Sequence, residues 1–348
     1  MPEADSKPSS FTRFRALLAL LVTLLIGAVV IIAVTWWVVG SAPRSQAIAE
    51  REGVSVSEFV ALPDEDAYPA ALAIADNGTV YTGSYQTGAL WAISPDGAIS
   101  EIADSRARIG SVTGLDVGPD GALYILDRLA ALESRGAVVW RYSAGELASV
   151  VQIPADPTIG LQLPDDIAVD SAGLIYISDR DPARVWRYSS GGQNLGIFWR
   201  PPAGEEAAPT GLAYDSQRNA ILVSDSARDA LYRVPASASE LATAIDLTET
   251  LFNDEARQGY GFDGIDVTPA GDIYLALLAW NRAARLEQGE LVMLARDFRG
   301  ASDLVYDAAR ERLIVTNWNQ FSLGFGTRPQ LPFALDVIEL AGRDRVDA

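Results

Sequence analysis

One pattern of short strands and turns occurs six times along this chain, and it constrains the fold more than any other feature. The clearest copy is LQLPDDIAVDSAGLIYISDRDPARVWRY, residues 161–188. Its apolar runs at 167–169, 174–178 and 184–188 are rich in Ile, Val, Tyr and Trp and are separated by Asp and Gly, which is typical of strands joined by turns. The copies begin at Ala71, Gly114, Asp166, Gly211, Gly264 and Asp303.

The spacing of the copies predicts a closed ring of sheets. Four copies continue into a clear third strand, at 88–94, 137–143, 184–189 and 230–235. Units of about 40–50 residues with three or four strands are blades of a β-propeller. We therefore predict an all-β, six-bladed β-propeller over 55–342, followed by a tail at 343–348. Residues 57–62 are expected to complete the last blade beside 333–340, which would remove a free sheet edge.

The N-terminal region carries a candidate transmembrane helix. Residues 17–39 contain no charged side chain, and at about 1.5 Å per residue such a helix is long enough for a bilayer core. Basic residues in 1–16 predict that this tail is cytoplasmic and that the propeller is extracytoplasmic, a single-pass type II arrangement. The alternative is a cleaved signal peptide, because 40–42 are small residues. Residues 40–54 are predicted to be a linker.

Composition excludes several classes of function. The chain has 46 acidic and 27 basic residues, a net charge of −19, and neither His nor Cys. We expect no nucleic-acid partner, because such binding needs Lys and Arg against the phosphates. Ser-His-Asp and Cys-His catalysis and His- or Cys-ligated metals are excluded. Any catalysis must use carboxylates, Tyr, Lys or a hard cation held by oxygen atoms.

The residue just before each innermost strand of a propeller faces the central channel at one end. In this chain the position is occupied by Ala70, Thr113, Asp165, Thr210, Asp263 and Ser302. Two carboxylates, Asp165 and Asp263, are therefore expected at one channel mouth with hydroxyl groups between them, which suits a hard cation such as Ca²⁺. A bound ion would polarise a carbonyl while a carboxylate deprotonates water. Both acids are also candidates for capping the turns that enter the strands.

Other polar residues have simpler interpretations. Acids follow the second strand at the same place in three copies, and we predict that they are turn caps: Asp127, Asp179 and Asp225. Tryptophans in third strands are predicted to pack between blades: Trp91, Trp140 and Trp186. Asn317, Trp318 and Asn319 end a strand of the last copy and are candidates for the rim of the channel.

Two copies also carry a family resemblance. PDDIAVDSAGLIYISD and FDGIDVTPAGDIYLAL resemble the senescence-marker-protein/gluconolactonase/luciferin-regenerating-enzyme family of six-bladed propellers, over about 55–340. The first copy, YPAALAIADNGTVYTGSYQTGALWAI, is similar to strictosidine-synthase-like proteins. The first resemblance implies a hydrolase of lactones or esters that holds one divalent cation at the channel mouth. In that family a Glu, an Asn and the Asp of a Pro-Asp-Gly motif bind the cation, and the Asp also serves as base.

Carried onto this sequence, the resemblance implies roles for particular residues. Asp263 matches the Asp of Pro-Asp-Gly, so it is implied as metal ligand and catalytic base. Asp165 stands where the family has a substrate-side Asn and is implied as a ligand or substrate contact, with Thr113 and Ser302 as further substrate-binding positions. Thr210 replaces the metal-binding Asn, and the Glu position falls on Ala70, which has no ligand atom.

Three functions follow from these residues. The first is a membrane-anchored, calcium-dependent lactone or ester hydrolase with a degraded ligand set. The second is a non-catalytic propeller that binds a small molecule or a protein partner at the channel face, which Ala70 and Thr210 favour. The third is a strictosidine-synthase-like enzyme that uses a channel carboxylate without a metal.

Overall fold

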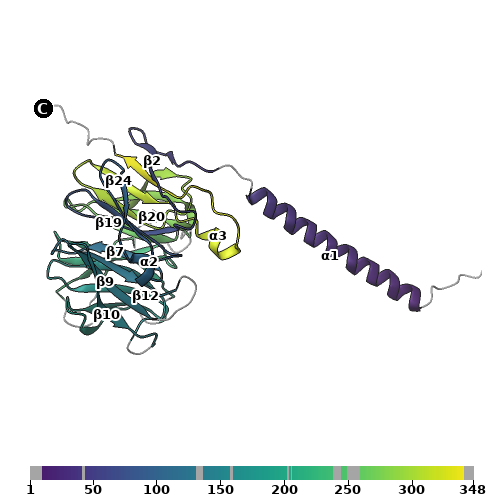
Figure 1. Cartoon of the computed structure of the whole chain (residues 1–348), viewed down its shortest axis with the longest axis horizontal. Helices are drawn as coiled ribbons and strands as arrows, with labels where there is room; N and C mark the ends of the chain where they lie inside the picture. The colour runs from purple at the N-terminus through teal and green to yellow at the C-terminus, as the bar shows by residue number, and fades with distance from the viewer. Residues whose placement is uncertain are drawn as a thin grey trace, which may run out of the picture. The chain divides into compact units, whose positions relative to one another are not determined.

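The computed structural model describes residues 10–40, 44–130, 136–156, 160–201, 204, 206–237, 244–248 and 259–340. Its strands form six antiparallel sheets, and the chain is an all-β six-bladed propeller preceded by one N-terminal apolar helix (Figure 1). Contacts divide the chain into two units, one of Met1–Arg44 with Phe321–Pro329 and one of Ser45–Gln320 with Gln330–Ala348. The second unit contains the propeller.

Each blade runs outward from an innermost strand. The first three blades are β3 (Pro69–Ile74), β4 (Val80–Ser84), β5 (Leu90–Ile93) and β6 (Ile99–Glu101); β7 (Val112–Val117), β8 (Leu123–Asp127), β9 (Ala137–Ser143) and β10 (Glu146–Ile153); and β11 (Pro164–Val169), β12 (Ile175–Arg180), β13 (Ala183–Tyr188) and β14 (Asn194–Trp199). The next two are β15 (Pro209–Asp215), β16 (Ala220–Asp225), β17 (Ala230–Pro235) and β18 (Ile245–Asp246); and β19 (Phe262–Val267), β20 (Ile273–Leu277), β21 (Arg282–Glu287) and β22 (Glu290–Arg296). Short helices connect strands at α2 (Ser105–Arg108), η1 (Leu278–Trp280) and α3 (Gln320–Phe325).

The sixth blade closes the ring with a strand from the other end of the chain. It consists of β23 (Leu304–Asp307), β24 (Arg312–Thr316), β25 (Ala334–Glu339) and β2 (Ser55–Ala61). Strand β2 pairs antiparallel with β25, so the predicted closure is confirmed. The predicted linker at 40–54 is partly wrong, because β1 (Ile48–Ala49) pairs with β22 and extends the fifth blade. The unpaired backbone groups along the outer edge of β22 explain the pairing.

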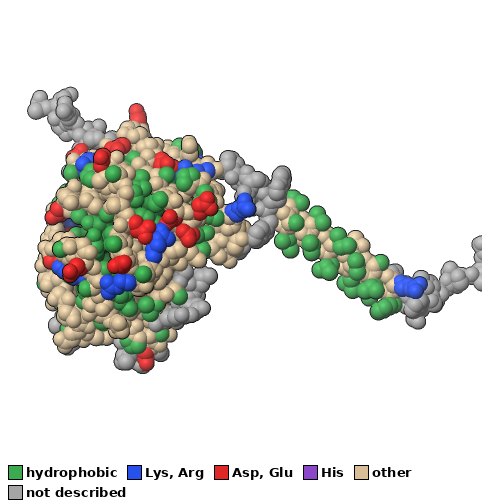
Figure 2. Space-filling view, viewed as in Figure 1, with side chains coloured by type: hydrophobic (Ala, Val, Ile, Leu, Met, Phe, Trp, Pro, Cys, Tyr) green, Lys and Arg blue, Asp and Glu red, His purple; other side chains and the backbone are tan. Residues whose placement is uncertain are grey.

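The N-terminal helix α1 spans Ser10–Gly40. It begins inside the predicted tail at 1–16, and its most apolar part is Leu17–Thr35, which is long and apolar enough to cross a membrane or to serve as a signal sequence. Figure 2 shows the surface of this helix covered by hydrophobic side chains. The predicted tail at 343–348 lies outside the described residues.

The core lies between neighbouring blades, because each sheet is covered on both faces and its strands are almost continuously apolar. Trp186 and Tyr188 of the third blade, for example, pack with Leu126 and Val139 of the second. Trp91 is fully buried, Trp186 is buried, and Trp140 packs against a core cluster of the first two blades. The prediction that these tryptophans pack between blades is confirmed for Trp140 and Trp186, and Trp91 is buried.

Buried caps fix the entry to the innermost strands. The three predicted caps, Asp127, Asp179 and Asp225, are fully buried and accept hydrogen bonds from backbone N–H groups of the preceding loop. Asp127 Oδ1, for instance, accepts from the N–H of Ser111 (3.0 Å) and of Leu129 (2.7 Å). In the last blade Asn317 has the same role towards the N–H of Arg299 (2.8 Å). The predicted capping role is confirmed. Each of the three aspartate caps pairs with the first residue of an innermost strand, so the residue that follows the cap lies at the end of the propeller where the innermost strands begin.

Candidate functional site

The hydroxyl groups predicted at the mouth are used to join blades. Thr210 is buried, and its Oγ1 donates to the carbonyl oxygen of Phe262 in the next blade (2.8 Å). Ser302 is also buried and donates to the carbonyl oxygen of Ala70 (2.8 Å), across the junction between the last blade and the first. Both hydroxyl groups therefore stabilise the ring at the mouth, and neither presents an unused donor to a ligand.

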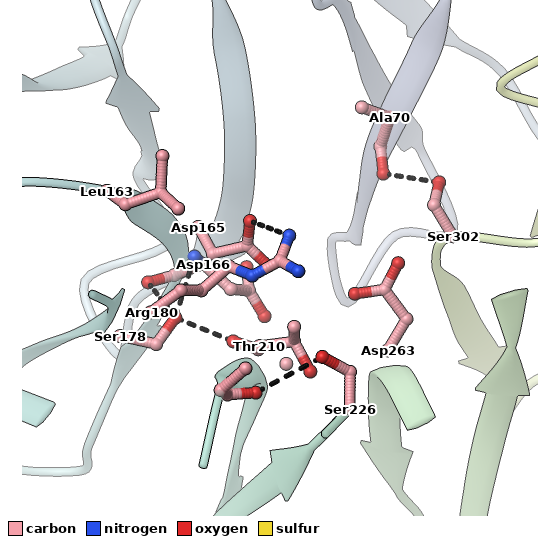
Figure 3. Close-up of polar contacts among 12 residues, drawn as sticks. Ala70, Leu163, Asp165, Asp166, Ser178, Arg180, Thr210, Ser226, Asp263 and Ser302 are labelled. Carbon is pink, nitrogen blue, oxygen red and sulfur yellow. Dashed lines mark hydrogen bonds and ion pairs between the residues drawn. The ribbon is translucent and has the colours of Figure 1, made fainter. Parts of the chain in front are cut away.

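Asp165 and Asp263 do come together at the mouth, as predicted, but an arginine accompanies them. Figure 3 shows both carboxylates directed towards the guanidinium of Arg180. Asp165 Oδ1 pairs with Arg180 Nη1 at 3.5 Å, and its side chain is 20% exposed. No hydrogen bond joins the Asp263 carboxylate to another described residue, so its oxygen atoms remain available to a ligand or a water molecule.

Arg180 was not predicted from the sequence, although the sequence contains a signal for it. Arg180 is the last residue of β12 and directly follows the cap Asp179. Its N–H donates to the carbonyl oxygen of Leu163 (3.0 Å), which fixes its backbone beside Asp165. Reading the position after each cap, as we read the position before each innermost strand, finds a second ring of mouth residues: Arg128, Arg180, Ser226 and Trp318.

Burial and neighbouring charges change the protonation of Asp263. The pKa of Asp263 is raised well above its usual value, chiefly by burial and then by the nearby charge of Asp165, while Arg180 opposes this shift. Asp165 in turn raises the pKa of Arg180, which stays charged. A buried carboxyl group with a raised pKa accepts a proton more readily than an exposed one, which suits it to act as a general base.

Tyr85, Arg128 and Trp318 form the side of the mouth contributed by the sixth, first and second blades. Arg128 Nη1 donates to the Tyr85 hydroxyl (3.3 Å), and the Tyr85 ring contacts the Trp318 ring edge-on at 5.1 Å. The place of Trp318 at the rim stays a prediction, whereas the prediction is wrong for Asn317, which is fully buried and caps the loop at Arg299. The hydroxyl of Thr113, a predicted substrate contact, is buried and has no hydrogen-bond partner among the described residues.

The residues at the mouth do not fit a calcium ion as they are arranged. Calcium takes six to eight oxygen ligands, whereas the only carboxylate without a protein partner at the described mouth is that of Asp263. Asp165 is paired with Arg180, whose positive charge opposes a cation, and Thr210 is engaged with Phe262. The described residues contain no group of three or more acids placed to hold a metal ion. We assign no chemical step to an ion, and calcium binding stays a prediction.

A second set of carboxylates lies deeper in the channel and was not predicted. Each accepts a backbone N–H from the innermost strand of the next blade, at distances of 2.6–2.8 Å; they are Asp116, Asp166, Asp266 and Asp303. They line a cavity of about 210 Å³. Burial raises the pKa of Asp116 to about 7 and that of Asp266 to about 6. Their oxygens are committed to backbone N–H groups, so their role is to join blades.

Comparison with known proteins supports the fold. No protein-family model and no curated protein matches the chain. Solved structures do match: a gluconolactonase from Xanthomonas campestris has 16% identity and a TM-score of 0.59 over 86% of this chain and 99% of that one. A protein of unknown function from Bacteroides thetaiotaomicron has 13% identity and a TM-score of 0.61, over 82% of this chain and 76% of that one. Virginiamycin B lyase from Staphylococcus aureus has 16% identity and a TM-score of 0.52, over 76% of this chain and 83% of that one. At these identities the likeness shows the propeller fold, and similarity to strictosidine-synthase-like proteins is not shown.

Proposed function

We propose that this propeller is a hydrolase of lactones or esters whose active site is the channel mouth, with Asp263 as the general base. The observation that carries the proposal is the Asp263 carboxylate, which has a raised pKa, makes no hydrogen bond to a described residue and faces the guanidinium of Arg180. The gluconolactonase among the structural neighbours has the same fold, which is consistent with this reaction class.

The residues suggest a reaction that needs no metal. The ionised Asp263 takes a proton from a water molecule, and the water oxygen forms a bond to the carbonyl carbon of the substrate. Arg180, held by Asp165 at 3.5 Å, stabilises the negative charge that develops on the carbonyl oxygen. When the ring or ester C–O bond breaks, Asp263 returns the proton to the leaving oxygen, and a hydroxy acid or an acid and an alcohol are formed.

Substitution of Asp263 tests this proposal. The full-length protein in detergent is assayed against a panel of lactones and esters, with added Ca²⁺ and with a chelator. We expect Asp263→Asn to lower kcat/KM by at least about 100-fold, since it removes the base. Asp76→Asn, which changes an exposed acid in the turn after β3, is the matched control and should retain full activity. The proposal would be contradicted if the Asp263→Asn variant kept its activity, or if the unmodified protein hydrolysed no member of the panel. Loss of activity on addition of the chelator would instead support the calcium prediction.

A non-catalytic ligand-binding propeller is the second candidate. It is favoured by Ala70, which offers no side-chain ligand, and by the hydroxyl groups of Thr210 and Ser302, which are engaged with the backbone of neighbouring blades. Calorimetry that detects binding of a small molecule without turnover of any member of the panel would support this function over hydrolysis.

We also propose that α1 is an uncleaved membrane anchor with the propeller outside the cytoplasm. The apolar stretch Leu17–Thr35 and the basic residues before it support this orientation. Protease added to intact cells should digest the propeller, and mass spectrometry should find the N-terminal segment still attached. A protected propeller would contradict the orientation, and a mature chain that starts near residue 41 would identify a signal peptide.

A further inference from the structure

The mouth contains a second arginine, Arg128, that no described acid neutralises. Arg128 follows the buried cap Asp127, and its N–H donates to the carbonyl oxygen of Ser111 (2.9 Å), so its backbone is fixed. Among the described residues, the one partner of its guanidinium is the Tyr85 hydroxyl, a neutral group at 3.3 Å. In the part of the chain that the structure describes, no carboxylate forms an ion pair with it. Arg180, by contrast, is paired with Asp165.

Tyr85 holds Arg128 at the mouth. Its side chain is buried, its ring contacts that of Trp318 at 5.1 Å, and its carbonyl oxygen accepts a hydrogen bond from Ser111 Oγ (2.7 Å). The charges of Arg128, Asp165 and Arg180 all act on the Tyr85 hydroxyl. Arg128 follows β8 of the second blade, next to the third blade that carries Asp165 and Arg180, so these residues share one end of the propeller.

Among the described residues, the mouth has buried hydrogen-bond donors without acceptors. Arg128 Nε, Arg180 Nε and Trp318 Nε1 are buried, and none has a hydrogen-bond partner among the described residues. All three groups only donate. Because a buried donor without an acceptor is costly, the arrangement is suited to a ligand that brings acceptor oxygens.

We propose that Arg128 and Trp318 bind the carboxylate of a small organic acid, so that the substrate of the mouth is a carboxylate-bearing lactone or ester. A planar guanidinium matches the two oxygens of a carboxylate in a bidentate pair. A single negative charge fits better than a dianionic phosphate, because the carboxylates of Asp165 and Asp263 lie at the same end of the propeller and the Arg180 charge is shared with Asp165. The reaction rests on the proposed hydrolase function, whereas the carboxylate site itself does not.

Calorimetric titration of the full-length protein in detergent tests the carboxylate site. The probes are glucuronate and glucose, which differ by a carboxylate in place of a hydroxymethyl group. We expect glucuronate to bind at least about tenfold more tightly than glucose, as a charge-assisted hydrogen-bonded pair requires. Arg128→Gln should lose about tenfold of the glucuronate affinity, and Arg128→Lys should restore part of it. Arg310→Gln, whose arginine pairs with Asp307 at the opposite end of the propeller, is the control and should bind normally.

Thermal unfolding checks that each variant is folded, and Trp318→Phe gives a second variant that keeps the ring but removes the Nε1 donor. It should bind glucuronate several-fold more weakly. Equal affinity for the two sugars, unchanged binding in both variants, or tighter binding of inorganic phosphate than of glucuronate would overturn the proposal. Glucuronate binding without turnover of any lactone would uphold the carboxylate site and refute the hydrolase function. Hydrolysis of neutral lactones with no preference for glucuronate over glucose would uphold the hydrolase function and refute the carboxylate site.

Discussion

At the scale of single residues, the aspartates of this chain show how the surroundings decide the role of one side chain. Asp179 is fully buried, accepts backbone N–H groups and pairs with Arg184 at 2.9 Å, so it is a structural cap. Asp116 accepts the N–H of Val169 (2.7 Å) and joins two blades. Asp263 has no such partner among the described residues and is the one left for chemistry.

The raised pKa of Asp116 predicts a pH-dependent stability. Its pKa is about 7 in the folded chain, chiefly because of burial, against an ordinary value of 3.8. The folded state therefore binds this proton more tightly than the unfolded state, and the stabilisation is complete below about pH 4 and is lost as the pH rises towards 7. The effect is at most about 4 kcal/mol, at 1.36 kcal/mol per pKa unit, and smaller where channel water reaches the carboxyl group.

Denaturant unfolding between pH 4 and 8 measures this effect. The free energy of unfolding of the unmodified protein minus that of Asp116→Asn should fall as the pH rises, because Asn does not titrate. The exposed-acid control Asp76→Asn should show no such trend. If this value instead rises with pH, the folded protein favours the ionised form of Asp116 and the prediction is wrong.

Recurrence allowed some site residues to be predicted and left others out of reach. Asp127, Asp179 and Asp225 occur at one place in three copies, so their capping role could be inferred. The direction of the Thr210 hydroxyl could not be, because it depends on the backbone of Phe262 in another blade. The pairing of Asp165 with Arg180 likewise depends on how two strands of one blade meet at the mouth.

At the scale of elements, strands with a strong apolar pattern could be predicted and edge strands could not. The predicted strands at 137–143 and 230–235 match β9 and β17, because these strands are covered on both faces. The outer strand β10 mixes exposed and buried positions and gave no clear period. Strand β21, RAARLE, carries Arg and Glu at half-buried positions and was missed for the same reason.

Strand β2 is predicted to hold the ring closed. Deleting 55–61 removes the strand that pairs with β25 and exposes its edge. Each hydrogen bond lost between β2 and β25 costs about 1 kcal/mol, and together they amount to a large part of a typical free energy of unfolding of about 5–15 kcal/mol. We expect the deletion variant to be unfolded or aggregated by circular dichroism and sedimentation.

The control replaces 48–49 with Gly-Ser, which removes only the short β1 pairing at the outer edge of the fifth blade. This variant should remain folded, with a modest loss of stability. A deletion of 55–61 that unfolds as cooperatively as the unmodified protein would show that the ring does not need β2.

At the scale of the whole molecule, the ring brings together at one mouth residues that are far apart in the chain. Asp263 comes from the fifth blade, Arg180 and Asp165 from the third, and Arg128 and Tyr85 from the second and first. The six copies were sufficient to predict this ring, because each copy needs neighbours to bury its two faces. They were not sufficient to predict the balance of charge at the mouth, which depends on side chains that differ between copies.

The pH dependence of kcat/KM for the hydrolysis of a lactone tests the central claim, that Asp263 is a base tuned by charges from the third blade. The base acts when ionised, so activity rises with pH through the pKa of Asp263. Arg180 lowers this pKa and Asp165 raises it. We predict that Arg180→Gln moves the acidic limb of the profile to higher pH and Asp165→Asn moves it to lower pH, each by roughly one unit. Limbs that do not move, or that move in the same direction, would contradict the account.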